Sequence, residues 1–92
     1  MAYIDGHCDV ISKLLSNRSA DFRDSTSICA TLPRMMKGEA MLQCFAIYIS
    51  DQYTPQTFEL VLKSIDLYMR KIVSQPQIVP IRKAADLELI RP

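Results

Sequence analysis

The stretch Tyr3-Ile4-Asp5-Gly6-His7-Cys8-Asp9-Val10 places an imidazole and a carboxylate two residues apart, directly behind a short apolar run. In an extended backbone, side chains two residues apart point to the same face. We therefore expect His7 and Asp9 to converge, and Cys8 to point the other way, into the protein. A neutral imidazole nitrogen and a carboxylate oxygen both suit zinc, at about 2.0–2.2 Å. The pattern predicts His7 and Asp9 as half of a metal site.

The rest of such a site has to come from elsewhere. His7 is the single histidine of the chain, whereas a catalytic zinc site uses three protein ligands and a structural one uses four. Asp9 also has a second explanation, because the apolar spacing that follows predicts a short amphipathic helix from Val10 to about Asn17, with Asp9 at its N-cap. Both interpretations of Asp9 stay open at this stage. Cys8 is not predicted to be a nucleophile, since its side chain should lie on the face opposite to His7.

Three segments together resemble the N-terminal part of the membrane dipeptidase (renal dipeptidase) family: Ile4-Asp5-Gly6-His7-Cys8-Asp9, Lys37-Gly38 and Gln43-Cys44-Phe45-Ala46-Ile47-Tyr48. The resemblance extends from about Ile4 to about Ile90. This family belongs to the metal-dependent amidohydrolases, and its members carry a His-x-Asp pair at the end of the first barrel strand. The resemblance implies that His7 and Asp9 help to bind one zinc of a two-zinc centre, and that the substrates are dipeptides.

The same resemblance implies the fold class, which is α/β with the N-terminal β/α units of a (β/α)8 barrel. Such a barrel typically needs about 250 residues, and this chain has 92. We therefore expect residues 1–92 to form a single partial domain, without the bridging glutamate and the two histidines that the family carries on later strands. This portion should be inactive alone. It should also self-associate, because an opened barrel leaves an unpaired strand edge.

Charge and composition argue against several classes of partner. The 11 basic and 10 acidic residues give a net charge of +1, and the basic residues are scattered, so no nucleic-acid partner is expected. No apolar run approaches the roughly 20 residues of a membrane span, and the N-terminus lacks a signal-peptide pattern. We expect a soluble cytoplasmic chain with no membrane partner. The three cysteines lack Cys-x-x-Cys spacing and are expected to be reduced core residues.

Local patterns predict the first elements of the chain. Ala2 to Asp5 should form a strand, and the polar residues 17–27 should form a loop with Phe22 as a possible anchor. Ile28 to Ala30 should be briefly extended. Thr31 is a good N-cap for a helix that runs to about Lys37 and stops at Gly38. Its methionine pair, Met35 and Met36, is expected to fill the core rather than to line a ligand groove.

The remaining pattern predicts one long strand and one long helix. Ala40 to Ile49 is apolar without alternation, as in a central parallel strand. In a barrel its carboxyl end would bring Tyr48, Ser50 and Asp51 toward His7 and Asp9, although a strand end with ordinary turn residues is the favoured explanation of the three. Thr54-Pro55 should begin a helix that ends near Ser74 and packs one face on the sheet. That face consists of Phe58, Val61, Leu62, Ile65, Tyr68, Met69 and Ile72. Gln77 to Ile81 should be an edge or irregular strand, and Lys83 to Ile90 a short helix.

Two other functions remain possible on the sequence alone. The chain could be a stand-alone domain that keeps the fold elements of the family without the enzyme. It could also be a small α/β interaction module whose His-x-Asp pair is coincidental.

Overall fold

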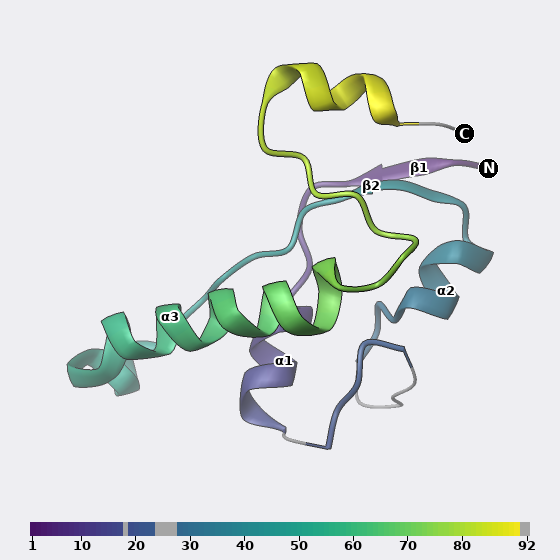
Figure 1. The fold of residues 1–92 in the computed structure, drawn as a ribbon. Helices are drawn as coiled ribbons and strands as arrows, with labels where there is room; N and C mark the ends of the chain where they lie inside the picture. Colours follow the sequence, from purple (N-terminus) through teal and green to yellow (C-terminus); the bar gives the residue numbers. More distant parts are fainter. Residues whose placement is uncertain (18, 24–27, 91–92) are drawn as a thin grey trace.

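The computed structural model describes residues 1–17, 19–23 and 28–90. Its only regular sheet within those residues has two parallel strands, β1 (Tyr3–Asp5) and β2 (Ala40–Gln43). Between them the chain forms two short helices, α1 (Val10–Ser16) and α2 (Leu32–Lys37). Figure 1 shows the two strands side by side, with α1 and α2 on the same side of the sheet. A parallel pair joined by helical segments is the expected α/β arrangement.

A long helical segment follows the second strand. It begins with the 3-10 helix η1 (Asp51–Gln56), continues as α3 (Thr57–Leu67) and ends as the π-helical segment η2 (Tyr68–Val73). The last element is the 3-10 helix η3 (Ala84–Leu89), which lies on the other side of the sheet from α3 in Figure 1. The Asp86 carboxylate caps η3 by accepting the backbone N–H groups of Arg82 and Lys83, at 2.9 and 3.2 Å.

The core lies where α1, α2 and the polar loop meet the end of the long helix. Its buried residues are Val10, Ile11, Leu14, Ala20, Phe22, Ile28, Leu32, Met35 and Ile72. Phe22 has no exposed surface and packs edge-to-face on Phe45, with ring centroids 5.8 Å apart. Its expected role as the loop anchor is therefore confirmed. The expected loop also includes Arg18 and residues 24–27, which lie outside the described part of the chain.

Several predicted elements are confirmed with small shifts. The helix expected after Thr31 runs from Leu32 to Lys37 with Thr31 as N-cap. Met35 is buried but Met36 is 58% exposed, so only one of the pair fills the core. The expected extension at Ile28–Ala30 is a bend rather than a strand, and the chain from Gln77 to Ile81 is irregular without forming a strand.

The predicted strand from Ala40 to Ile49 is too long. Regular pairing ends at Gln43, although the backbone N–H groups of Cys44 and Ala46 still donate to the carbonyls of Asp5 and Cys8, both at 3.0 Å. The reason is that the partner chain leaves the extended conformation after Asp5, where it turns toward α1. The ladder therefore loses its regular register. Burial on both faces was also wrong, since β2 is half-buried and Ile47 and Tyr48 are exposed.

Two other burial predictions are wrong. Cys29 and Cys44 are exposed free thiols, and only Cys8 is half-buried against the core. The long helix packs mainly on α1 rather than on the sheet. Of its predicted buried face, Ile72 is fully buried, Val61 and Tyr68 are half-buried, and Phe58, Leu62, Ile65 and Met69 are exposed. Periodicity identified the apolar side of this helix but not the element that it contacts.

The end of α2 contains a strained residue that the sequence did not predict. The helix stops at Gly38, as expected, but Gly38 has an ordinary φ of −82° and it is the next residue, Glu39, that has a positive φ of 63°. A left-handed conformation is unfavourable for a residue with a Cβ atom. The Glu39 carboxylate contacts the N-terminal ammonium, and both groups are exposed. Such an exposed pair offsets little of the backbone strain.

We expect Glu39→Gly to raise the free energy of unfolding by about 0.5–1 kcal/mol, because glycine adopts a positive φ without steric cost. Urea denaturation of the two proteins measures this difference. Glu39→Gln is the matched control, since it removes the charge and keeps the Cβ atom. Equal effects of the two substitutions would show that charge rather than backbone strain is responsible.

Candidate metal centre

His7 and Asp9 lie in the turn that leads from β1 into α1. The turn begins at Asp5, whose Oδ1 accepts the backbone N–H of His7 at 3.1 Å. This hydrogen bond holds the pKa of Asp5 below its usual range, and a further hydrogen bond from the Gln43 side chain acts in the same direction. The Asp5 carboxylate therefore closes a local turn of the Asx type, which places the His7 backbone at the carboxyl end of β1.

The two predicted side chains come together in the structure. Nε2 of His7 lies 3.1 Å from Oδ1 of Asp9, and both side chains are more than half exposed. The extended backbone assumed in the prediction is not the cause, since Asp9 has a ψ of 29° and the strand has already ended at Asp5. The side chains converge because this turn keeps both of them on the solvent side.

The alternative role of Asp9 as a helix cap is only half realised. Asp9 occupies the N-cap position of α1, and its carbonyl accepts the first helical hydrogen bond, from Lys13 N–H at 3.2 Å. Its carboxylate makes no capping hydrogen bond to the helix. Since the side chain faces His7 instead, the carboxylate oxygens are directed away from the helix backbone.

Cys8 lies on the opposite side of the turn, as expected. It is half-buried against the core, and this burial raises the pKa of its thiol. A raised pKa leaves less of the thiolate that would act as a nucleophile. Cys8 is therefore a packing residue between its two polar neighbours.

This assignment predicts an order of thiol reactivity. We expect iodoacetamide to modify the exposed Cys29 and Cys44 first and Cys8 last at mildly alkaline pH, because Cys8 is less accessible and its burial raises the pKa of its thiol. Peptide mapping by mass spectrometry over a time course measures the three rates. Full denaturation in urea is the control, and it should make the three rates similar. If Cys8 in the folded chain were the fastest to react, its packing role would be refuted.

A pocket of about 740 Å³ lies beside the His7–Asp9 pair. It is bounded by one side of α1, by the chain that follows β2 and by the start of the long helix. Its lining residues are His7, Asp9, Ser12, Lys13, Leu15, Ser16, Tyr48, Ile49, Ser50, Tyr53, Gln56 and Leu60. The Ser12 hydroxyl reaches the Tyr48 carbonyl across this space at 3.5 Å, so α1 and the segment after β2 meet there.

Of the three residues expected near the site, Tyr48 and Ser50 line the pocket and Asp51 does not. Lys13, Tyr53 and Leu60 also line the pocket and were not predicted from the sequence. Ser12, Lys13 and Ser16 lie on the polar side of the amphipathic helix α1, and helical spacing alone does not show that this side is a pocket wall. The neighbouring element, which turns this side into a pocket wall, is more than 30 positions away in the chain.

The donor atoms of His7 and Asp9 fit a shared metal ion. Two ligand atoms at about 2.0–2.1 Å from a tetrahedral zinc lie roughly 3.3 Å apart, close to the 3.1 Å between Nε2 and Oδ1. Among the described residues, no group of three or more histidine, cysteine, aspartate or glutamate side chains is arranged to hold a metal. Within that part of the chain, His7 and Asp9 therefore offer two donor atoms side by side and no third joins them.

Comparison with known protein families shows to which family the chain belongs. The family model described as membrane dipeptidase, peptidase family M19, matches residues 1–91. The chain belongs to the membrane dipeptidase family. Members of this family are metal-dependent dipeptidases with a (β/α)8 barrel, so the expected relationship is confirmed. No curated protein matches the sequence. Despite the family name, no helix in the described residues is long and apolar enough to span a membrane.

Proposed function

We propose that this chain carries the first two zinc ligands of a dipeptidase centre, Nε2 of His7 and a carboxylate oxygen of Asp9. The observation that carries the proposal is the 3.1 Å separation of these two atoms at the edge of a pocket. Family membership over residues 1–91 supports the metal and the class of reaction. The exposure of both side chains leaves room on the solvent side for the remaining ligands.

The residues of the turn prepare this pair for a metal. Asp5 holds the His7 backbone through its hydrogen bond to the N–H group, and the packing of Cys8 anchors the turn to the core. The Asp9 carboxylate makes no hydrogen bond to the helix that metal binding would have to break. In enzymes of this kind, bound zinc polarises the scissile carbonyl and lowers the pKa of the attacking water.

We further propose that the dipeptide binds in the pocket beside this pair. Its volume of about 740 Å³ falls within the roughly 300–1,000 Å³ typical of small-molecule sites. Apolar walls from Leu15, Ile49 and Leu60 suit a side chain of the substrate, and Lys13 supplies a cation that suits its carboxylate. His7 and Asp9 lie at one edge, where a scissile bond would meet the metal.

The experiment measures zinc content and dipeptide hydrolysis on the same dialysed sample, for the native chain and for Asp9→Asn. We expect the native chain to bind zinc, Asp9→Asn to bind it much more weakly, and neither to turn over a dipeptide. Hydrolysis is not expected because these 92 residues contain a single histidine, whereas the resemblance implies that a complete centre uses two further histidines and a bridging glutamate. Asp51→Asn is the matched control, since it removes an exposed carboxylate outside the pocket. Equal zinc content in Asp9→Asn and the native chain would overturn the ligand assignment, and turnover would overturn the expected inactivity.

A further inference from the structure

The chain that continues β1 contains one residue more than the segment after β2 that lies beside it. The carbonyl of Asp5 accepts the N–H of Cys44 at 3.0 Å, and the carbonyl of Cys8 accepts the N–H of Ala46 at 3.0 Å. Three steps along the chain from Asp5 to Cys8 therefore match two steps from Cys44 to Ala46. This arrangement is a β-bulge, in which residues 6–7 lie opposite Cys44.

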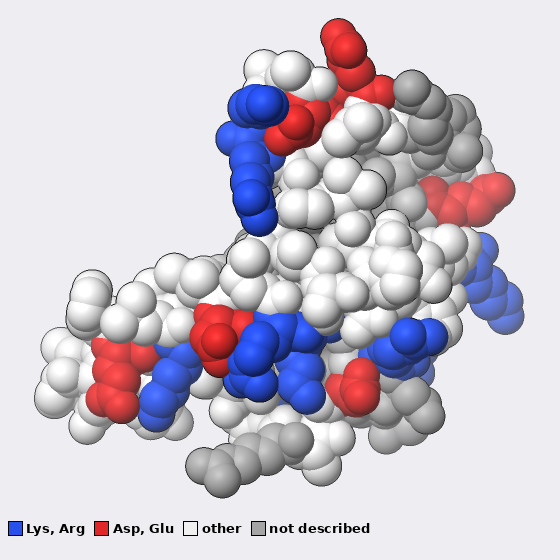
Figure 2. Space-filling model, in the orientation of Figure 1, with Lys and Arg blue, Asp and Glu red and all other residues white. Residues whose placement is uncertain are grey.

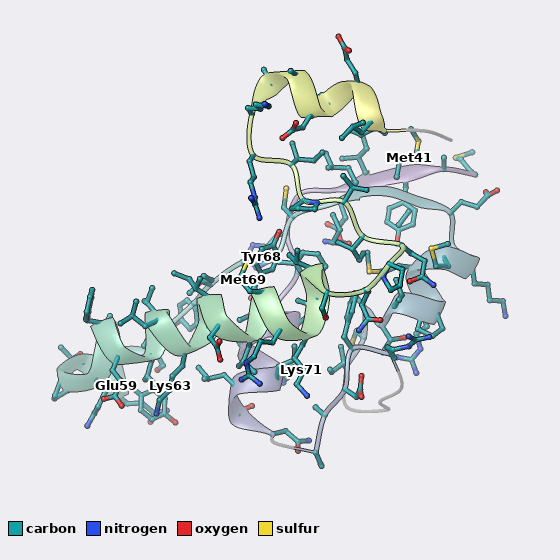
Figure 3. The ribbon with its side chains drawn as sticks, in the orientation of Figure 1. Met41, Glu59, Lys63, Tyr68, Met69 and Lys71 are labelled. Carbon is teal, nitrogen blue, oxygen red and sulfur yellow. The ribbon has the colours of Figure 1, made fainter. Side chains whose placement is uncertain are left out.

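Phe45 marks the core side of the segment after β2. Its ring packs against Phe22 and Tyr68, with ring centroids 5.8 and 6.1 Å apart. Figure 3 shows Tyr68 on the side of the long helix that faces the two strands. Directly paired residues of neighbouring strands share a face of the sheet. The side chain that lies opposite Phe45 therefore points into the core as well.

The bulge decides that the side chain opposite Phe45 is Cys8 rather than His7. A regular pair that continued the match of Asp5 with Gln43 by two residues would place His7 opposite Phe45, on the core side. With the extra residue, Cys8 takes that position and packs against the core. A shift of one residue exchanges the faces of all the side chains that follow. The bulge thus directs the residues on either side of Cys8 to the pocket that they line.

The Asp5 carboxylate holds the bulge in place. Its Oδ1 accepts the N–H of His7, which belongs to the bulge, at 3.1 Å. The Gln43 side chain donates to the same carboxylate, and its Nε2 also donates to the carbonyl of Cys44 at 3.1 Å. Gln43 therefore connects the bulge to the neighbouring strand. Gly6 is not what holds it, since its φ is not positive and an added Cβ atom would meet no described atom within 4 Å.

The acidic side chains of the long helix make a different kind of contact. Glu59 pairs with Lys63 at 3.3 Å, and Asp66 pairs with Arg70 at 2.7 Å, both at the surface. Figure 2 shows acidic and basic groups alternating along this helix. Such exposed pairs contribute little to stability. Asp5 instead accepts hydrogen bonds from a backbone N–H and an amide at the junction of two strands, so it acts on the geometry of the turn.

We propose that Asp5 and Gln43 are positioning residues of the metal centre. They hold the bulge, and the bulge directs Nε2 of His7 and the carboxylate of Asp9 to one ion, which neither positioning residue touches. The inference rests on the proposed function, because that proposal makes His7 and Asp9 the ligands. It requires a hydrogen-bond acceptor at position 5 rather than a negative charge, since an amide oxygen also accepts the His7 N–H.

The test compares Asp5→Ala with Asp5→Asn by the rate at which iodoacetamide modifies Cys8 and by calorimetric titration with zinc. Asp5→Ala removes the acceptor, so Cys8 should react several-fold faster. Its dissociation constant for zinc should rise about tenfold, at the lower end of the cost of losing an outer partner of a metal ligand. Asp5→Asn keeps the oxygen and should match the native chain in both measurements. Gln43→Met removes the amide at similar length and should shift both values in the same direction, by a smaller factor.

Asp21→Ala is the matched control. Oδ1 of Asp21 accepts the N–H of Arg23 at 2.8 Å, which is the same contact between residues two apart, in the loop and away from the bulge. This variant should leave the zinc affinity and the Cys8 rate unchanged. Circular dichroism checks that each variant remains folded, and Gln43→Met tests the inference if Asp5→Ala does not fold.

Three results would overturn the inference. They are native values in both Asp5→Ala and Gln43→Met, an Asp5→Asn chain as impaired as Asp5→Ala, and an equal effect of Asp21→Ala. The second would show that the charge of position 5 is the cause. A native chain that binds no zinc would overturn the proposed function instead, and the Cys8 rates alone would then decide whether Asp5 and Gln43 hold the bulge.

Discussion

Replacing His7 with alanine is expected to lower the affinity of the chain for zinc by more than about 100-fold, because the loss of an outer partner of a metal ligand already costs 10–100-fold. His7 is the single imidazole of the chain, so no other histidine can take its place. Calorimetric titration with zinc measures the change. The stoichiometry should be near one zinc per chain in the native protein, with any remaining positions filled by water or by another molecule.

The double variant His7→Ala with Asp9→Asn makes this prediction sharper. If both side chains bind the same ion, their effects on affinity should not add, because either loss alone removes most of the site. Asp51→Asn should titrate like the native chain. Additive effects would contradict the binding of one ion by both side chains, and zinc affinities unchanged by either substitution would mean that the 3.1 Å contact between Nε2 and Oδ1 is an ordinary surface hydrogen bond.

Phe22→Ala is expected to lower the free energy of unfolding by about 3–5 kcal/mol, the usual cost of deleting a buried aromatic ring. Phe22 is fully buried and contacts Phe45 edge-to-face. Its carbonyl also accepts the N–H of Leu32 at 2.8 Å, which ties the loop to α2. A small domain is stable by only about 5–15 kcal/mol, so this variant should be folded in a much narrower range of urea concentration.

The Phe22→Ala substitution should also disturb the candidate metal centre. Phe45 lies between Cys44 and Ala46, whose N–H groups hold the carbonyls of Asp5 and Cys8. A cavity beside Phe45 should therefore loosen the turn that carries His7. Phe58→Ala is the matched control, because Phe58 is 77% exposed and should change monomer stability by less than about 0.5 kcal/mol. Urea denaturation at low protein concentration measures the free energy of unfolding of both variants. A similar loss of stability in Phe22→Ala and Phe58→Ala would contradict the assigned core.

The sequence predicted local structure best where one short signal was sufficient. Thr31 and Pro33 mark the start of α2, and the helical spacing after Asp9 marks α1. The convergence of His7 and Asp9 was also predicted, although for an incomplete reason. The Asx turn at Asp5 depends on a single hydrogen bond to the His7 N–H group, and spacing alone does not show it.

The errors arose where distant contacts decide the outcome. The strand after Ala40 ends early because its partner turns away after Asp5, and the long helix exposes Phe58 because it packs on α1 through another face. The side of α1 that carries Lys13 faces a pocket only because Tyr53 and Leu60 lie across from it. Periodicity gives the apolar side of an element, but the partner of that side depends on contacts many residues away.

The most direct test of the central claim is the ¹⁵N spectrum of the His7 imidazole during a zinc titration. The single histidine gives one pair of ring nitrogen signals, so no assignment by mutation is needed. We expect the signal of Nε2, the nitrogen that faces Asp9, to shift on zinc addition while Nδ1 keeps its proton. Unchanged ring signals at saturating zinc, or coordination through Nδ1, would contradict the placement of a metal between His7 and Asp9.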